Sequence, residues 1–106
     1  MLPEARTRRA APQEVRATLR KPVRFKARLR EGAAVRFDIL VHDLSITGLR
    51  GETALHLRVG ATVWVTLPGL SGLETVVVWR RGDQFGARFV QPLHPAVFEH
   101  IVEAGR

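Results

Sequence analysis

The stretch VHDLSITGL, residues 41–49, decides how the rest of the sequence is interpreted. It follows a run of alternating apolar residues and contains an acid, a hydroxyl and a glycine at Asp43, Ser45 and Gly48. Asp and Ser side chains bond to nearby backbone and favour turns, while glycine leaves room for a close neighbour. The stretch therefore predicts a rigid connection between strands that presents a carboxylate and a hydroxyl on one side. Taken alone, the pattern also fits a turn that only shapes the fold.

The residues on either side of this stretch alternate between apolar and polar, as is typical of half-buried strands. The alternation predicts six strands, at residues 23–30, 35–42, 49–52, 61–67, 73–80 and 85–89. Between them we expect a turn at 31–33, a loop at 68–72 and a tight hairpin at 81–83. In the fifth strand, Val77 and Trp79 are expected to share one face.

The C-terminal residues change to the period of a helix. Pro95 suits a first helical turn, and Phe98, Ile101 and Val102 follow the spacing of an amphipathic helix over about residues 95–104. Six short strands and one helix predict an all-β fold with one C-terminal helix. We expect a small six-stranded antiparallel β-barrel whose helix covers an opening or an edge.

Composition narrows the class of protein. The 106 residues suffice for one domain with a modest core, and 45% of them are apolar, which is typical of a globular chain. The absence of cysteine excludes disulfides, thiolate metal sites and a cysteine nucleophile. No apolar run approaches the roughly 18 residues of a membrane span, and the N-terminus lacks a signal-peptide core. We therefore expect a cytoplasmic protein.

The net charge of +7 is concentrated near the N-terminus. Residues 1–30 hold ten Lys or Arg and two Glu, which gives +8, whereas residues 31–106 hold seven Arg and eight acids, which gives −1. We predict a flexible basic tail at residues 1–14 and a folded domain at residues 15–106. Such a basic segment either attracts phosphates, in nucleic acid, nucleotide or lipid, or only aids solubility.

The sequence offers little support for catalysis or metal binding. Its four histidines lie in separate predicted elements without zinc spacing, and it lacks both a nucleophile elbow and a glycine-rich phosphate loop. His42 and Asp43 are neighbours on a predicted strand and should point to opposite faces, which disfavours acid–base catalysis. We expect a binding module and not an enzyme, with no catalytic residue, metal or cofactor. Trp64 and Trp79 are expected to be core or half-core residues.

Two short motifs, in this order, are similar to those of a known family. R-x-x-x-R occurs at residues 16–20, just before Lys-Pro-Val, and D-x-S-x-x-G occurs at residues 43–48. Later strands carry VVVW at residues 76–79 and FGARF at residues 85–89. From about residue 15 to 104 the chain resembles PilZ domains, small split-barrel receptors for the bacterial second messenger cyclic di-GMP.

The resemblance implies a set of ligand-binding residues: Arg16, Arg20, Asp43, Ser45 and Gly48, with Trp79 as a further candidate. An arginine fork matches the acceptor edge of guanine or two phosphate oxygens, and a carboxylate suits the N–H donors of guanine. R-x-x-x-R also occurs at residues 20–24. We prefer the motif at residues 16–20, because in the family the second arginine stands just before the x-Pro-Val that opens the first strand. Where many members carry another arginine this chain has Val15, which leaves open whether one or two ligand molecules bind.

The resemblance also implies a mode of signalling. Closure of the arginine segment over bound ligand would transmit the signal to an effector protein, which the sequence does not identify. One alternative is a PilZ-like module that acts through protein partners without binding nucleotide. A nucleic-acid-binding barrel is less favoured, because the sequence shows no exposed aromatic cluster for base stacking.

Overall fold

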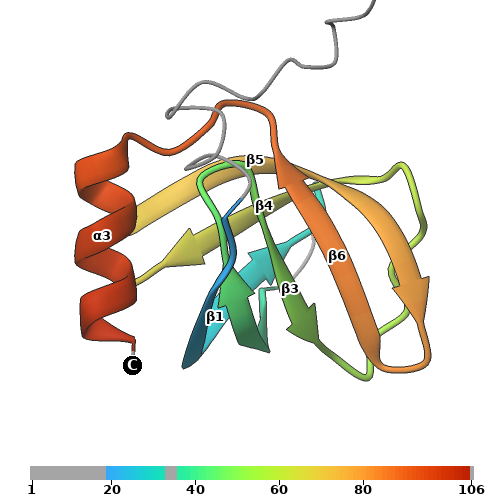
Figure 1. The fold of residues 1–106 in the computed structure, drawn as a ribbon. Coiled ribbons are helices and arrows are strands. Elements are labelled where there is room, and N and C mark those ends of the chain that lie inside the picture. The colour runs from blue at the N-terminus through green and yellow to red at the C-terminus, as the bar shows by residue number, and fades with distance from the viewer. Residues whose placement is uncertain (1–18, 33–35, 106) are drawn as a thin grey trace, which may run out of the picture.

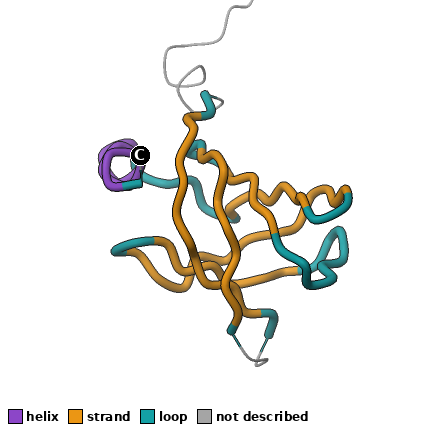
Figure 2. The backbone as a smooth tube through the Cα atoms, turned by 90° about the horizontal axis from the view of Figure 1, so that it is seen from below, coloured by secondary structure: helices purple, strands orange, loops and turns teal. Residues whose placement is uncertain are grey.

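The computed structural model describes residues 19–32 and 36–105. Its strands are β1 (Lys21–Arg30), β2 (Phe37–Leu44), β3 (Gly48–Glu52), β4 (Thr62–Leu67), β5 (Leu70–Arg81) and β6 (Gln84–Phe89), followed by the helix α3 (Pro95–Ala104). Antiparallel pairing closes the strands into a barrel in the order β1-β2-β3-β6-β5-β4. The strands enclose the core and the helix stands at one side (Figures 1 and 2). The predicted barrel with one C-terminal helix is confirmed, whereas the predicted tail at residues 1–14 lies outside the described residues.

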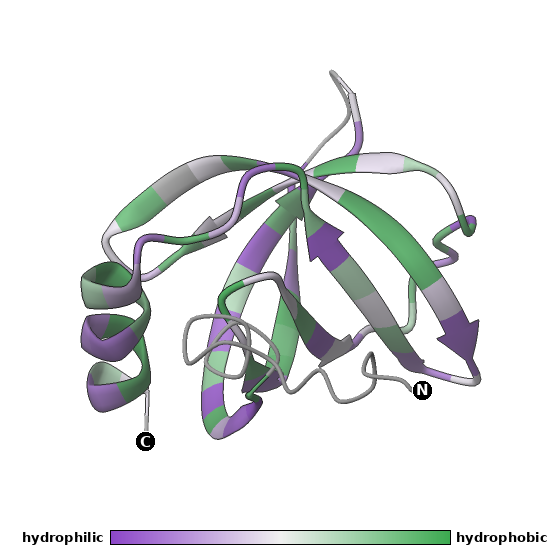
Figure 3. Cartoon of the chain, turned by 45° about the horizontal axis from the view of Figure 1, so that its top comes forward, coloured by the Kyte–Doolittle hydropathy of each residue, from purple (hydrophilic) through white to green (hydrophobic). Residues whose placement is uncertain are grey.

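Alternating apolar residues build the inside of the barrel. In β4, Val63, Val65 and Leu67 are buried, while Trp64 and Thr66 between them are partly exposed. Apolar and polar segments alternate along the strands in Figure 3. Successive strand residues point to opposite faces, so this pattern gives each strand one apolar face, and the closed sheet buries all of these faces together.

The helix α3 covers one side of the barrel with the apolar face that its period predicted. Phe98, Ile101 and Val102 are buried in the common core. The backbone N–H of Arg24 in β1 donates to the carbonyl of Gly105 at the end of the helix over 2.8 Å. Within the described residues, no helix has both the length and the apolarity that crossing a membrane requires.

Several strand boundaries differ from the predicted ones, and two of these differences change the interpretation. β2 continues to Leu44, so Asp43 is a strand residue and does not lie in the turn. The predicted loop at 68–72 is wrong, because β5 already begins at Leu70, which pairs with Leu67. Pro68 and Gly69 suffice for a tight turn, and the residues after them are free to pair.

Bulges explain two further errors in the predicted orientation of side chains. The β2–β3 register shifts between Val41 and Asp43, and the β5–β6 register shifts between Val77 and Trp79. A bulge inserts one residue and reverses the alternation beyond it. Val77 is therefore buried while Trp79 is partly exposed on the outside, contrary to the prediction that the two share a face.

The same effect applies to the neighbours His42 and Asp43. His42 bonds to Glu52, with 2.8 Å between Nε2 and Oε1, and Asp43 bonds to Arg50. Both partners are partly exposed side chains of β3. The prediction of opposite faces for His42 and Asp43 is therefore wrong, but each has a partner of its own.

Phe98 tests the helix–barrel packing. Because its ring is fully buried, Phe98→Ala should lower the free energy of unfolding by about 3–5 kcal/mol, measured by urea denaturation. Val90→Ala is the control, because Val90 is 43% exposed. A loss of stability in Phe98→Ala no larger than that in Val90→Ala would show that the helix does not pack as described.

Candidate functional site

The turn between β2 and β3 is built around the buried side chain of Ser45. Its hydroxyl oxygen accepts from the N–H of Thr47 at 3.2 Å and of Gly48 at 3.1 Å, and donates to the Gly48 carbonyl at 3.3 Å. Ser45 is only 3% exposed. The hydroxyl thus satisfies the backbone of its own turn, as Ser side chains do when they replace a backbone partner.

Gly48 allows this turn to lie against β6. A Cβ atom at position 48 would stand 2.2 Å from the carbonyl oxygen of Ala87, far inside van der Waals contact. The turn is also bonded to the end of β6 and the segment after it, because Phe89 donates to the Thr47 carbonyl and Leu93 to the Ile46 carbonyl, each over 2.8 Å. We call residues 45–48 the serine corner. Its position relative to β6 and to the segment leading into α3 is fixed by these contacts.

Just before the serine corner, the carboxylate of Asp43 joins two arginines. Its Oδ1 accepts from Nη1 of Arg20 at 3.0 Å, and its Oδ2 accepts from Nε of Arg50 at 2.7 Å. Nη1 of Arg50 also donates to Oε1 of Gln84 at 2.8 Å. The Asp43 side chain is 14% exposed, whereas that of Arg20 is 54% exposed. Asp43 therefore anchors a fixed guanidinium on β3 and an exposed one at the start of β1.

A row of paired residues continues from this cluster across the barrel. Asp43 pairs with Arg50, Arg50 with Gly86, and Gly86 with Trp79. Directly paired residues of antiparallel strands point to the same face. We call these four residues the outer row. It spans four strands, or about 14 Å at the usual spacing of neighbouring strands.

Gly86 makes room in the outer row for the indole of Trp79. A Cβ atom at position 86 would lie 2.0 Å from Nε1 of Trp79, so the ring lies directly over this glycine. The guanidinium carbon of Arg81 lies 6.0 Å from the ring centroid of Trp79. The outer row therefore carries paired charges at one end and a partly exposed aromatic ring at the other.

The structure brings some of the predicted site residues into contact, whereas the polar groups of others are bonded within the fold. Arg20 and Asp43 are in direct contact, and Trp79 lies in the same row. Ser45 and Gly48 adjoin this cluster, but their polar groups bond within the serine corner. Arg16 lies outside the described residues.

Arg50 is the site residue that the sequence analysis missed. It follows Gly48 by two positions in β3, so alternation alone places it on the same face as the glycine. Only the register of β2 against β3 shows that it faces Asp43. The signal in the sequence was an arginine two residues after the D-x-S-x-x-G motif.

The arrangement suits recognition of an anion. Guanidinium groups form bidentate bonds with phosphate, and the indole ring offers a stacking surface. Among the described residues, no three His, Asp or Glu side chains gather in a group that could hold a metal ion.

Ser45→Ala tests whether this hydroxyl has a structural task. Removing it leaves buried backbone groups of the serine corner without their partner, so the free energy of unfolding should fall by about 1–3 kcal/mol, measured by urea denaturation. Thr62→Ala is the matched control, since it removes a hydroxyl from an exposed residue of β4. Equal stability of the two variants would contradict the role assigned to Ser45.

Comparison with known families gives a match over most of the chain. The model of the PilZ domain matches residues 13–104, which includes the serine corner, the outer row and α3. No curated protein matches the sequence.

Proposed function

The chain belongs to the PilZ domain family, which generally consists of cyclic di-GMP receptors, and from this premise we propose that it binds cyclic di-GMP over the outer row. The observation that carries the proposal is the contact of Asp43 with both Arg20 and Arg50. This cluster stands at the D-x-S-x-x-G turn, and one of its arginines belongs to the R-x-x-x-R segment.

The chemistry of these groups suits a guanine nucleotide with two phosphodiester charges. A guanidinium donates two parallel bonds either to phosphate oxygens or to N7 and O6 of guanine. Arg20 has an exposed side chain that can turn to a ligand, and Arg16, four residues earlier, would add a second fork. Asp43 would hold these groups in place or accept from the N–H edge of guanine.

Trp79 and the serine corner would complete the site in different ways. The indole beside Gly86 gives a flat surface against which a guanine can stack. Ser45 is buried, so its contribution would be to hold the turn and Asp43 in place. Gly48 leaves the turn close to β6.

The proposed output is a change in the segment that precedes β1. Arg20 lies directly before Lys21, the first residue of β1. A ligand that draws Arg16 and Arg20 onto the barrel would order this segment, and ordering of a segment is a common way to create or remove a surface for a protein partner.

Isothermal titration of cyclic di-GMP into the purified protein tests the proposal. Arg20→Ala and Asp43→Ala should each weaken binding by about ten-fold or more, because a hydrogen bond to a charged group contributes about 1.5–3 kcal/mol. Arg58→Ala is the control, because Arg58 is an exposed arginine of the β3–β4 loop and belongs to neither the outer row nor the serine corner.

Two results would contradict the assignment. Undiminished affinity in both Arg20→Ala and Asp43→Ala would place the ligand elsewhere. Absence of binding heat for the unchanged protein, together with a melting temperature that no concentration of cyclic di-GMP raises, would favour the PilZ-like module that acts through protein contacts alone.

A further inference from the structure

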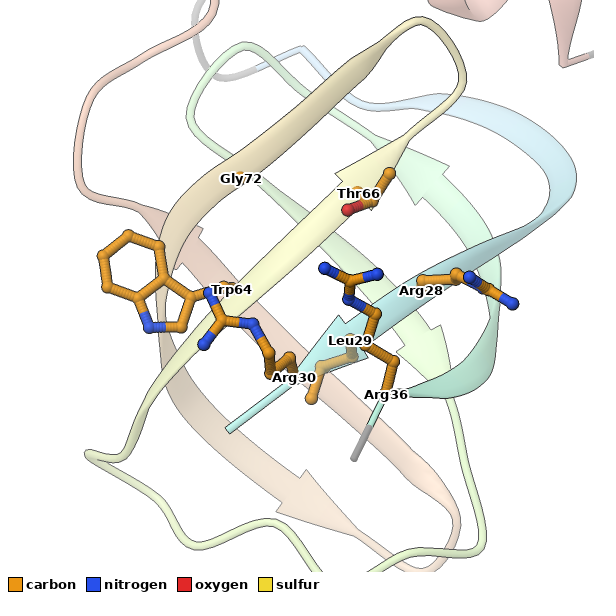
Figure 4. A pocket seen from close by; sticks show the side chains of 7 residues that line it. All are labelled: Arg28, Leu29, Arg30, Arg36, Trp64, Thr66 and Gly72. Atoms are coloured by element: carbon orange, nitrogen blue, oxygen red, sulfur yellow. The ribbon is translucent and has the colours of Figure 1, made fainter. Parts of the chain in front are cut away.

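A second charged surface lies between β1 and β4. There, side chains of Arg28, Arg30, Arg36, Trp64 and Thr66 line a hollow of about 140 Å³ (Figure 4). Arg28 pairs with Thr66 and Arg30 with Trp64 where the two strands meet. We call this the arginine hollow. None of its residues belongs to the outer row or to the serine corner.

The arginines of this hollow lack the neutralising partner that the outer row has. Among the described residues, no carboxylate lies within ion-pair distance of Arg30 or Arg36, and Arg28 has only a 3.8 Å contact with Asp38 in which both side chains are 61% exposed. Such exposed pairs contribute little. Glu74 pairs with Trp64 from β5 but forms no ion pair with these arginines. Like charges gathered without a counter-charge favour binding of an anion.

Trp64 adds a stacking surface to these charges. The guanidinium carbon of Arg30 lies 5.7 Å from the ring centroid, and the ring is only partly buried. Figure 4 shows the guanidinium of Arg30 beside the indole and that of Arg36 pointing into the hollow below Thr66. Trp64 also borders a neighbouring hollow of about 300 Å³ on the side of Leu73 and Val90. Trp64 therefore borders two hollows, while the guanidinium of Arg30, which also donates to the carbonyl of Gly32, lies over one face of its ring.

The rest of β1 extends this charge in a line. The outward residues of the strand that carry positive charge are Arg24, Lys26, Arg28 and Arg30. Alternate residues of a strand are about 6.6 Å apart, so Lys26, Arg28 and Arg30 follow one another at that spacing, whereas the register around Arg24 is irregular. Asp38 and Glu52 line a hollow together with Lys26, so the positive charge is strongest at the Arg28–Arg30 end. A regular series of cations beside an aromatic ring is the arrangement with which proteins hold single strands, where cations follow the phosphates and rings stack on the bases.

We propose that single-stranded nucleic acid binds along the outer face of β1, with one nucleotide unit in the arginine hollow. Its phosphate bonds to Arg30 and Arg36, and its base stacks on Trp64. The sequence alone disfavours such a ligand for want of an exposed aromatic cluster, but the structure places Trp64 on the surface at the end of the basic strand. The site is independent of the outer row proposed for cyclic di-GMP.

The test measures binding of a fluorescently labelled ten-nucleotide oligothymidine by anisotropy at several salt concentrations, with the full chain. Every variant keeps residues 1–18, so any contribution of that basic segment is common to all. The variants are the double change Arg30→Ala with Arg36→Ala, Trp64→Leu, Trp64→Phe, and the charge control Arg58→Ala.

The double arginine variant should weaken binding by about ten-fold or more and reduce the salt dependence by about 0.7 for each phosphate that is no longer bound. Trp64→Leu should weaken binding by about five-fold or more, since stacking on one base contributes at least that much. Trp64→Phe keeps an aromatic face and should retain most of the affinity. Arg58→Ala should change affinity by less than about two-fold.

Several results would overturn the proposal. If Arg58→Ala weakens binding as much as the double arginine change does, the binding depends on the overall charge of the protein and not on the arginine hollow. If Trp64→Leu and Trp64→Phe have equal effects, the base does not stack on Trp64. Thymidine monophosphate that binds as tightly as the oligonucleotide would exclude a strand along β1. Failure here is separate from failure at the outer row, because oligonucleotide affinity is measured in the double arginine and Trp64 variants, whereas cyclic di-GMP affinity is measured in Arg20→Ala and Asp43→Ala.

Discussion

The contact of the serine corner with β6 is the constraint on which the rest of the structure depends. Gly48 lies so close to the Ala87 carbonyl that no larger residue fits, and the Ser45 hydroxyl replaces the partners that this tight turn would otherwise leave unbonded. β2 and β3 therefore leave the turn in a register that sets Asp43 against Arg50. The bonds from Phe89 and Leu93 tie the same turn to the segment that leads into α3. One local arrangement thus determines the charged cluster and the path to the helix.

The sequence predicts the barrel well because its signals are local. Alternation in β4 and the helical spacing of Phe98 and Ile101 each need only a few neighbouring residues, and both features occur as expected. Bulges do not follow from such patterns, because an extra residue is tolerated wherever the partner strand permits it. The faces of Asp43 and Trp79 were therefore predicted incorrectly.

For the candidate site too, the sequence predicts the local motif but not the features that depend on pairing between strands. The motif that contains Asp43 and Ser45 can be identified in the sequence. The role of Arg50 depends on its pairing with Asp43 across two strands, which neither segment shows by itself. The sequence also does not show that Asp43 and Ser45 have different roles within the motif. Asp43 faces outward to the arginines, while the hydroxyl of Ser45 is turned to its own backbone. Burial, which only the folded chain defines, separates these two roles.

The salt bridge between Arg20 and Asp43 has a consequence for how the two charged surfaces are related. Asp43 already occupies the position that an arriving anion would take on Arg20, so docking there is an exchange of one negative partner for another and not a simple gain of attraction. Arg20 immediately precedes β1, and the far end of the same strand supplies Arg28 and Arg30 to the arginine hollow. One strand thus connects an ion pair that an arriving anion would have to break with two arginines that have little negative charge beside them.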